Sequence, residues 1–249
     1  MKVKSKNKTK SKTKGKSIEQ ELRQKVATAG KILYHLKLTE YMGHVSARVP
    51  GTDRIIIKPR HSETVHGMGE VGPEKLVVID LDGNLVEGND DGDGPPSERF
   101  IHTEIYRARP DVGGVVHTHQ MLATVFGIVE RKILPILHVE APLLINGVPT
   151  YPSPDLITDP ERGKAVAKVI GKAEVCHLQG HGIATASATV EEATLAAIHL
   201  DRLAEANYIA AQLGGTPKII SHEQIEQMVA AGKFVGYKVR WAYYASLVS

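Results

Sequence analysis

The sequence predicts one mixed α/β domain, in which helices pack on the faces of a β-sheet. Short runs of β-branched residues, such as Ile55-Ile56-Ile57, alternate along the chain with longer segments of helical periodicity. No internal repeat and no linker divides these segments into two units. The chain has 249 residues, 42% of them hydrophobic, which is enough for one sizeable core.

The helices are expected where apolar residues recur with a period of three to four. They cover roughly residues 17–36, 97–107, 121–126 and 190–213. Ser17 begins the first, because Ser17-Ile18-Glu19-Gln20 fits a capping box. Ser97 can cap the second, which places Glu98 in its first turn.

The strands are expected in short apolar runs bounded by turn residues. They cover residues 54–57, 75–80, 111–117 and 175–179. Asp82-Gly83-Asn84 is a turn signal directly after the second of these, so we expect a hairpin that returns through Leu85-Val86.

The first 16 residues differ in composition from everything that follows. Lysine occupies every even position from Lys2 to Lys16, and removing these eight lysines takes the formal charge from +3 to −5. We therefore expect a disordered tail over residues 1–16 and a folded catalytic domain over residues 17–249. The tail is not expected to bind nucleic acid, although its charge leaves that alternative open.

Composition also restricts the class of protein. No apolar run approaches the length of a membrane span, and the N-terminus lacks the apolar segment of a signal peptide. Cys176 is the single cysteine, so no intrachain disulfide can form. A cytoplasmic protein without a membrane partner is the expectation.

Three histidines form the clearest candidate site. His117 and His119 flank Thr118 at the end of a predicted strand, where alternate side chains point the same way. His181 lies between Gly180 and Gly182, which allow the backbone to approach a ligand closely. Three imidazoles that converge in this way predict an open metal site, and hence an enzyme.

Two longer segments resemble a known family. The runs PPSERFIHTEIYRARPDVGGVVHTHQ and LQGHGIATASATVEEA resemble the class II aldolase and adducin-head family, and the similarity extends roughly from Ile18 to Tyr244. The family includes fuculose-phosphate and rhamnulose-phosphate aldolases, ribulose-phosphate 4-epimerase and methylthioribulose-phosphate dehydratase. The resemblance implies an α/β/α sandwich around a mostly antiparallel central sheet.

The resemblance also implies functional roles. His117, His119 and His181 match the metal ligands, and Glu98 matches the catalytic acid/base. One divalent ion per subunit is expected, zinc first, with manganese, iron or cobalt as alternatives. Members are generally homotetramers with active sites near subunit interfaces. Tyr237, Tyr243 and Tyr244 are therefore candidate interface or acid/base residues, with core packing as the equal alternative.

The chain departs from the sugar-phosphate pattern in three loops. Where those members carry G-N-x-S, T-P-[ST]-G and S-S before the glutamate, this chain reads Gly43-His44-Val45-Ser46, Lys58-Pro59-Arg60-His61 and Pro96-Ser97-Glu98. Proline removes a backbone donor, whereas arginine suits a carboxylate. We therefore expect a small anionic substrate bound by His44, Ser46, Lys58, Arg60, His61 and Ser97. A phosphate held by Arg and His is the alternative.

These departures resemble the decarboxylase branch of the family. The expected function is a divalent-metal-dependent carbon–carbon lyase. The first choice within that class is a decarboxylase that acts on a hydroxylated aromatic or heteroaromatic carboxylic acid and forms a metal-stabilised enolate. An aldolase or epimerase acting on a sugar phosphate or related hydroxy-ketone is the first alternative. A non-catalytic, adducin-like interaction module is the second.

Overall fold

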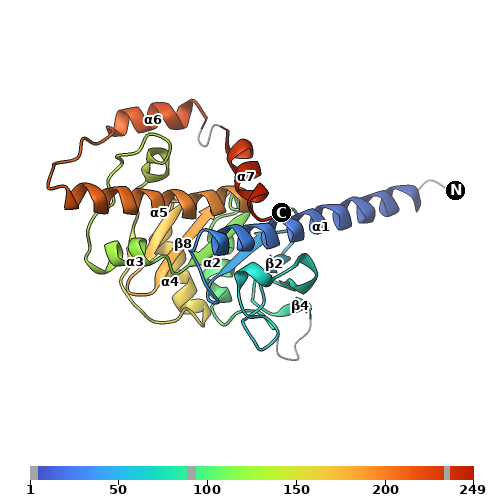
Figure 1. Cartoon of the computed structure of the whole chain (residues 1–249). Helices are drawn as coiled ribbons and strands as arrows, with labels where there is room; N and C mark the ends of the chain where they lie inside the picture. The colour runs from blue at the N-terminus through green and yellow to red at the C-terminus, as the bar shows by residue number, and fades with distance from the viewer. Residues whose placement is uncertain (1–4, 89–93, 233–235) are drawn as a thin grey trace.

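A single β-sheet organises the chain, with helices on both of its faces (Figure 1). The structure is a computed structural model that describes residues 5–88, 94–232 and 236–249, with side chains from Ile18 onward. Within these residues, eight strands pair in the order β4-β3-β2-β1-β5-β8-β7-β6. All neighbours are antiparallel except β6 and β7. The α/β/α sandwich with a mostly antiparallel sheet is therefore confirmed.

The strands are short, and six of the eight are buried along nearly their whole length. They are β1 (His44–Arg48), β2 (Ile55–Ile57), β3 (Val77–Ile79), β4 (Leu85–Glu87), β5 (Gly114–Thr118), β6 (Thr150–Tyr151), β7 (Val175–Leu178) and β8 (Gly182–Ser187). The hairpin of β3 and β4 confirms the turn signal at Gly83, where the backbone N–H of Asp80 donates to the Asn84 carbonyl.

The helices form two layers. They are α1 (Ser5–His35), α2 (Arg99–Ala108), α3 (Met121–Ile128), α4 (Pro160–Ile170), α5 (Val190–Gln212), α6 (His222–Ala230) and α7 (Tyr237–Ser246). α1, α3 and α5 share one apolar core with one face of the sheet, whereas α2 and α4 pack together on the other face. None of these helices is long and apolar enough to span a membrane, within the described ranges.

Three expectations about element ends were wrong. The first helix begins at Ser5, so Ser17 lies inside α1 and residues 5–16 are helical; lysine is a good helix former, and extending a helix costs less than starting one. The N-terminal part of α1 projects beyond the rest of the chain (Figure 1). Glu98, not Ser97, is the N-cap of α2, and β5 begins at Gly114 rather than Asp111.

Candidate metal and active site

The four residues predicted to form the site come from three separate elements. His117 lies in β5 and His119 just after it, Glu98 is the N-cap of α2, and His181 occupies the turn between β7 and β8. Because β5 pairs with β8, that turn is brought beside the end of β5. One ligand atom from each of the four residues lies within 4.8 Å of the other three. The structure therefore brings together every residue of the predicted metal cluster.

The donor chemistry of the cluster fits a divalent metal ion. His117 Nδ1 lies 2.8 Å from the Ile183 carbonyl oxygen, which can only accept, so Nδ1 donates and Nε2 keeps its lone pair. Neither ring nitrogen of His181 makes a well-formed hydrogen bond among the described residues: Nδ1 is buried without a partner, and Nε2 has an ion-pair contact of 3.4 Å with Glu98. Unpaired buried nitrogens are unfavourable, and coordination of an ion would satisfy them.

Glu98 is held at the edge of this cluster as a carboxylate. Its Oε1 accepts a hydrogen bond of 3.0 Å from the Ile157 N–H and lies 3.4 Å from His181 Nε2. Burial would raise the pKa of Glu98, but the contacts with His181, His117 and the Ile157 amide outweigh it and lower the pKa to about 2. Glu98 is therefore ionised near neutral pH.

Two glycines make the close approach of the turn possible. Gly180 has a φ of +70°, a conformation that side chains other than glycine rarely adopt. A Cβ atom on Gly182 would lie 2.4 Å from the Thr118 carbonyl oxygen and 3.3 Å from the rings of both His117 and His119. Glycine at position 182 is thus required for β8 to pass this close to the two imidazoles.

A second row of buried polar residues lies beside the cluster. His44 pairs with His117 across β1 and β5, and its Nδ1 lies 2.7 Å from His102 Nε2. His102 Nδ1 lies 2.6 Å from the Ser46 hydroxyl, which is 2.8 Å from the Tyr106 hydroxyl. Burial lowers the pKa of His44 well below its usual value and that of His102 to about 3, so both imidazoles are neutral.

The prediction from sequence missed His102 and did not anticipate the contacts of Ser46. His102 and Tyr106 follow Glu98 at steps of four residues, which places all three on one side of α2, and this spacing was the available signal. Ser46 was expected to bind substrate, but it is completely buried and its hydroxyl is engaged by His102 and Tyr106. The hydroxyl of Ser46 therefore contacts the row of polar residues beside the cluster and not the cluster itself.

Lys58 is an unusual buried cation next to this row. Its backbone N–H donates to the Val45 carbonyl, which places it directly beyond β2 and beside His44. Its side chain is only 4% exposed, and its Nζ donates to the Pro59 carbonyl oxygen. No carboxylate pairs with it among the described residues, and burial lowers its pKa to about 8. A buried ammonium without a counter-ion is a strong indication of an anion-binding position.

The remaining predicted substrate-binding residues are not brought into this buried cluster. Arg60, His61 and Ser97 are exposed. The ring of His61 meets Tyr41 edge-on at 5.4 Å, and the backbone of Arg60 donates to the Gly94 carbonyl. The structure gives none of the three a contact with the four-residue cluster.

The C-terminal tyrosines lie in the opposite layer. α7 packs against α1 and α5, on the face of the sheet away from α2. Tyr237 and Tyr244 are partly buried against that core, and Tyr243 is 60% exposed with its ring 5.2 Å from Tyr244. In the single chain, Tyr237 and Tyr244 therefore pack against the core, which is the alternative expected for them.

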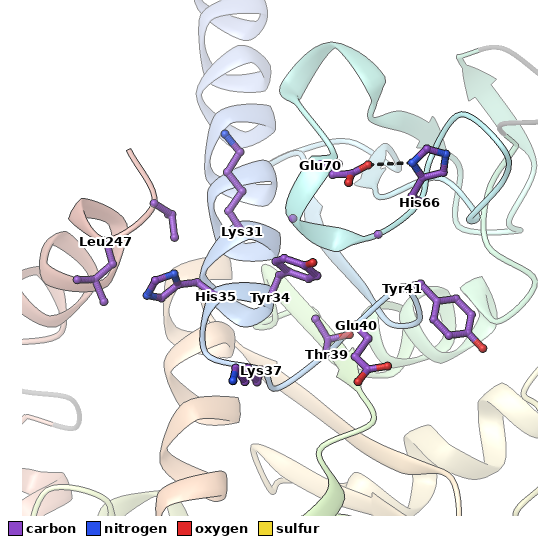
Figure 2. Close-up of a pocket in the computed structure, with 13 residues that line it drawn as sticks. Lys31, Tyr34, His35, Lys37, Thr39, Glu40, Tyr41, His66, Glu70 and Leu247 are labelled. Carbon is purple, nitrogen blue, oxygen red and sulfur yellow. Dashed lines mark ion pairs between the residues drawn. The ribbon is translucent and has the colours of Figure 1, made fainter.

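A surface cavity of the chain is separate from the histidine cluster. Figure 2 shows this space of about 1040 Å³ between α1, the loop after it and the segment that contains the His66–Glu70 ion pair. Its charged groups are of both signs, including Lys31 and Glu40, and its lining includes none of the predicted site residues. Its described lining also holds no buried polar atom without a partner. The chemistry is therefore assigned to the cluster around His117.

Comparison with known proteins identifies the family. Residues 24–208 match the family described as Class II Aldolase and Adducin N-terminal domain. The 3,4-dihydroxyphthalate decarboxylase of Arthrobacter keyseri is 29% identical over 234 residues, covering 91% of this chain and 94% of that protein. The protein of the same name from Terrabacter sp. (strain DBF63) is 31% identical over 229 residues, covering 89% and 94%.

The fold has a matching solved structure. An aldolase II superfamily protein from Pseudomonas syringae superimposes with a TM-score of 0.80 at 24% identity, covering 93% of both chains. Together with the family match and the two relatives, this similarity shows that the chain belongs to the class II aldolase and adducin family and is a lyase within it.

Proposed function

We propose that the chain is a divalent-metal-dependent decarboxylase of a hydroxylated aromatic or heteroaromatic carboxylic acid. The observation that carries the proposal is Lys58, a buried cation beside His44 and without an anionic partner among the described residues. The names of the two curated relatives, both dihydroxyphthalate decarboxylases, support the same substrate class.

The metal site in this proposal consists of His117, His119 and His181, with Glu98 beside them. Zinc is the first choice, with manganese, iron or cobalt as alternatives, because three imidazoles and a carboxylate suit all four. A divalent ion in this position would act as a Lewis acid that stabilises negative charge on a substrate oxygen when the carbon–carbon bond breaks.

Glu98 moves the proton in this proposal. Because its pKa is low, it meets the substrate as a carboxylate and can accept the proton of the substrate's hydroxyl group. It then returns that proton to the ring carbon that loses carbon dioxide, and the hydroxyl oxygen regains a proton from water. The net reaction consumes one proton and one carboxylate and gives one C–H bond and carbon dioxide.

Lys58 and His44 hold the carboxylate in this proposal. His44 lies in β1 opposite His117, and Lys58 directly follows β2, the strand paired with β1 on its other side; both are buried, and together they would give one anion a neutral and a charged donor. Arg60, expected to take this role, is exposed, and we assign the buried contact to Lys58 instead.

A substrate panel tests the proposal. Metal-loaded protein is incubated with hydroxyphthalates, hydroxylated pyridine dicarboxylates and ketose 1-phosphates, with protein treated with chelator as the control. Carbon dioxide released from an aromatic acid by the loaded protein only is the expected result. Formation of dihydroxyacetone phosphate or lactaldehyde would instead establish the aldolase alternative. Inactivity across the panel, together with no bound metal, would favour an adducin-like interaction module.

A further inference from the structure

Two neighbouring imidazoles in the site have different partners behind them. His44 and His117 are paired across β1 and β5, with ring centroids 4.9 Å apart. Behind His117 is the Ile183 carbonyl oxygen, at 2.8 Å from Nδ1. Behind His44 is another imidazole, that of His102, at 2.7 Å from Nδ1. A carbonyl oxygen fixes the tautomer of its partner, whereas an imidazole can act as donor or acceptor.

The direction of the hydrogen bonds behind His44 follows from which buried hydroxyl and imidazole protons have an acceptor. The four groups form a chain in which each contacts the next: Tyr106, Ser46, His102 and His44. If His44 donated to His102, His102 would donate to Ser46, and the hydroxyl proton of either Ser46 or Tyr106, both buried, would have no acceptor among the described residues. Orphaned buried donors are costly and rare.

The opposite direction gives the protons of Tyr106, Ser46 and His102 an acceptor each, and leaves only the N–H of His44 for a ligand. Tyr106 donates to Ser46, Ser46 donates to His102 Nδ1, and His102 Nε2–H donates to His44 Nδ1. Because His44 Nδ1 accepts this bond, it carries no proton, so the N–H of the His44 ring is on Nε2. His102 occupies Nδ1 of His44, so Nε2 of His44 is available to a ligand.

We infer that His44 and His117 are held in opposite tautomers, so that His117 Nε2 is a metal ligand whereas His44 Nε2–H is a hydrogen-bond donor to an anionic group of the substrate. His102 is the positioning residue that sets this difference. The assignment of that anionic group as the carboxylate rests on the proposed function. The inference also explains why His44, although adjacent to His117, stands outside the four-residue metal cluster.

The tautomers can be observed directly. Two-bond ¹H–¹⁵N correlation spectra are recorded on the zinc-loaded full chain labelled with ¹⁵N-histidine, and His44 is assigned by the loss of its signals in His44→Asn. We expect a proton on Nε2 of His44 and on Nδ1 of His117. A proton on Nδ1 of His44 would overturn the inference. This measurement requires no substrate, so it stands even if the proposed decarboxylation is not found.

Substitution of His102 gives the functional test. His102→Leu removes the donor behind His44, and we expect KM for the aromatic acid to rise about tenfold or more with a smaller change in kcat, since one hydrogen bond to a charged group is lost. His102→Gln keeps an amide N–H near the position of Nε2 and should restore most of the binding. Metal content should be unchanged in both variants, because His102 is not a metal ligand.

Equal losses of binding in His102→Leu and His102→Gln would show that the ring serves only packing. If His102→Leu does not fold, Ser46→Ala provides the second test, since it removes the donor to His102 Nδ1 and should also raise KM. When no acid in the panel is turned over, the dissociation constant of phthalate is measured by calorimetry in place of KM. If the wild-type protein binds phthalate but turns over no acid, the proposed reaction has failed, and the effect of the His102 variants on phthalate binding still tests the inference.

Discussion

The proposed function gives Glu98 and the three histidines separable roles. Glu98→Gln should leave metal content unchanged, because the three imidazoles remain, and should reduce turnover by about a hundredfold or more, since an amide cannot transfer the proton. The checks are metal analysis and initial rates on the same preparation. Unchanged turnover would remove Glu98 from the proton-transfer role.

The matched control for this variant lies in the same helix. Glu104 is also buried in α2, but it forms an ion pair with Arg107 and lies against Gly163 in α4. Glu104→Gln should therefore retain turnover, at some cost in thermal stability.

Lys58 predicts an alkaline limit to substrate binding. Burial lowers its pKa from 10.5 to about 8, so the ammonium is present below pH 8 and is lost as the pH rises above it. We expect kcat/KM, which reports the free enzyme, to fall above about pH 8. In Lys58→Arg this decline should disappear, because guanidinium remains protonated throughout.

The neutral variant completes this test. Lys58→Met should lower kcat/KM about tenfold or more at pH 7, because a charged hydrogen bond to the carboxylate is lost. Lys172→Met, which removes an exposed lysine, is the control and should behave as wild type. An alkaline decline that persists in Lys58→Arg would assign the titration to another group.

The pairing of β5 with β8 is the structural feature that brings the four residues of the proposed metal site together. Gly182→Ala should separate these strands, because the added Cβ would lie 2.4 Å from a backbone oxygen that cannot move alone. We expect metal affinity to fall about tenfold or more and the melting temperature to drop, as for other overpacked positions. Competition with a chromogenic chelator and thermal melting measure the two effects.

Gly215→Ala is the control for that variant, because a Cβ there meets no atom within 4 Å. It should leave both quantities unchanged. If Gly182→Ala binds metal as tightly as wild type, the close approach of β8 is not needed for the site.

Elements were predictable where local spacing was regular. The long helix α5 and the hairpin of β3 and β4 follow the apolar periodicity and a turn signal closely. β1 was missed, because His44, Ser46 and Arg48 give it a polar appearance, although only Arg48 is more than slightly exposed. His44 and Ser46 are buried against His102 of α2, a contact between distant segments that no local pattern indicates.

The N-terminal lysine-rich segment can be tested on the whole chain. Among the residues of α1 whose side chains the structure describes, 18–35, the first buried one is Val26, so we expect deletion of residues 1–16 to change neither the melting temperature nor the turnover. It should lower the isoelectric point, since eight lysines are lost. A drop of several degrees would show that these residues contact the fold. Salt-dependent retention on DNA that vanished on deletion would instead assign them a nucleic-acid partner.

The amino-acid sequence was sufficient to identify the family, the α/β/α class and the residues of the metal cluster. Each of these depends on motifs and spacings that are short enough to recognise along the chain, such as His-Thr-His and Gly-His-Gly. The structure then confirmed that the four cluster residues converge.

Only the tertiary structure decided which polar residues are buried beside that cluster. His102 contacts Ser46 across 56 residues of sequence, and His44 meets His117 because β1 pairs with β5. Lys58 is buried whereas Arg60 is exposed, although only Pro59 separates them. Burial and hydrogen-bond direction depend on contacts between distant segments, so they follow from strand pairing and packing and cannot be read from spacing along the chain.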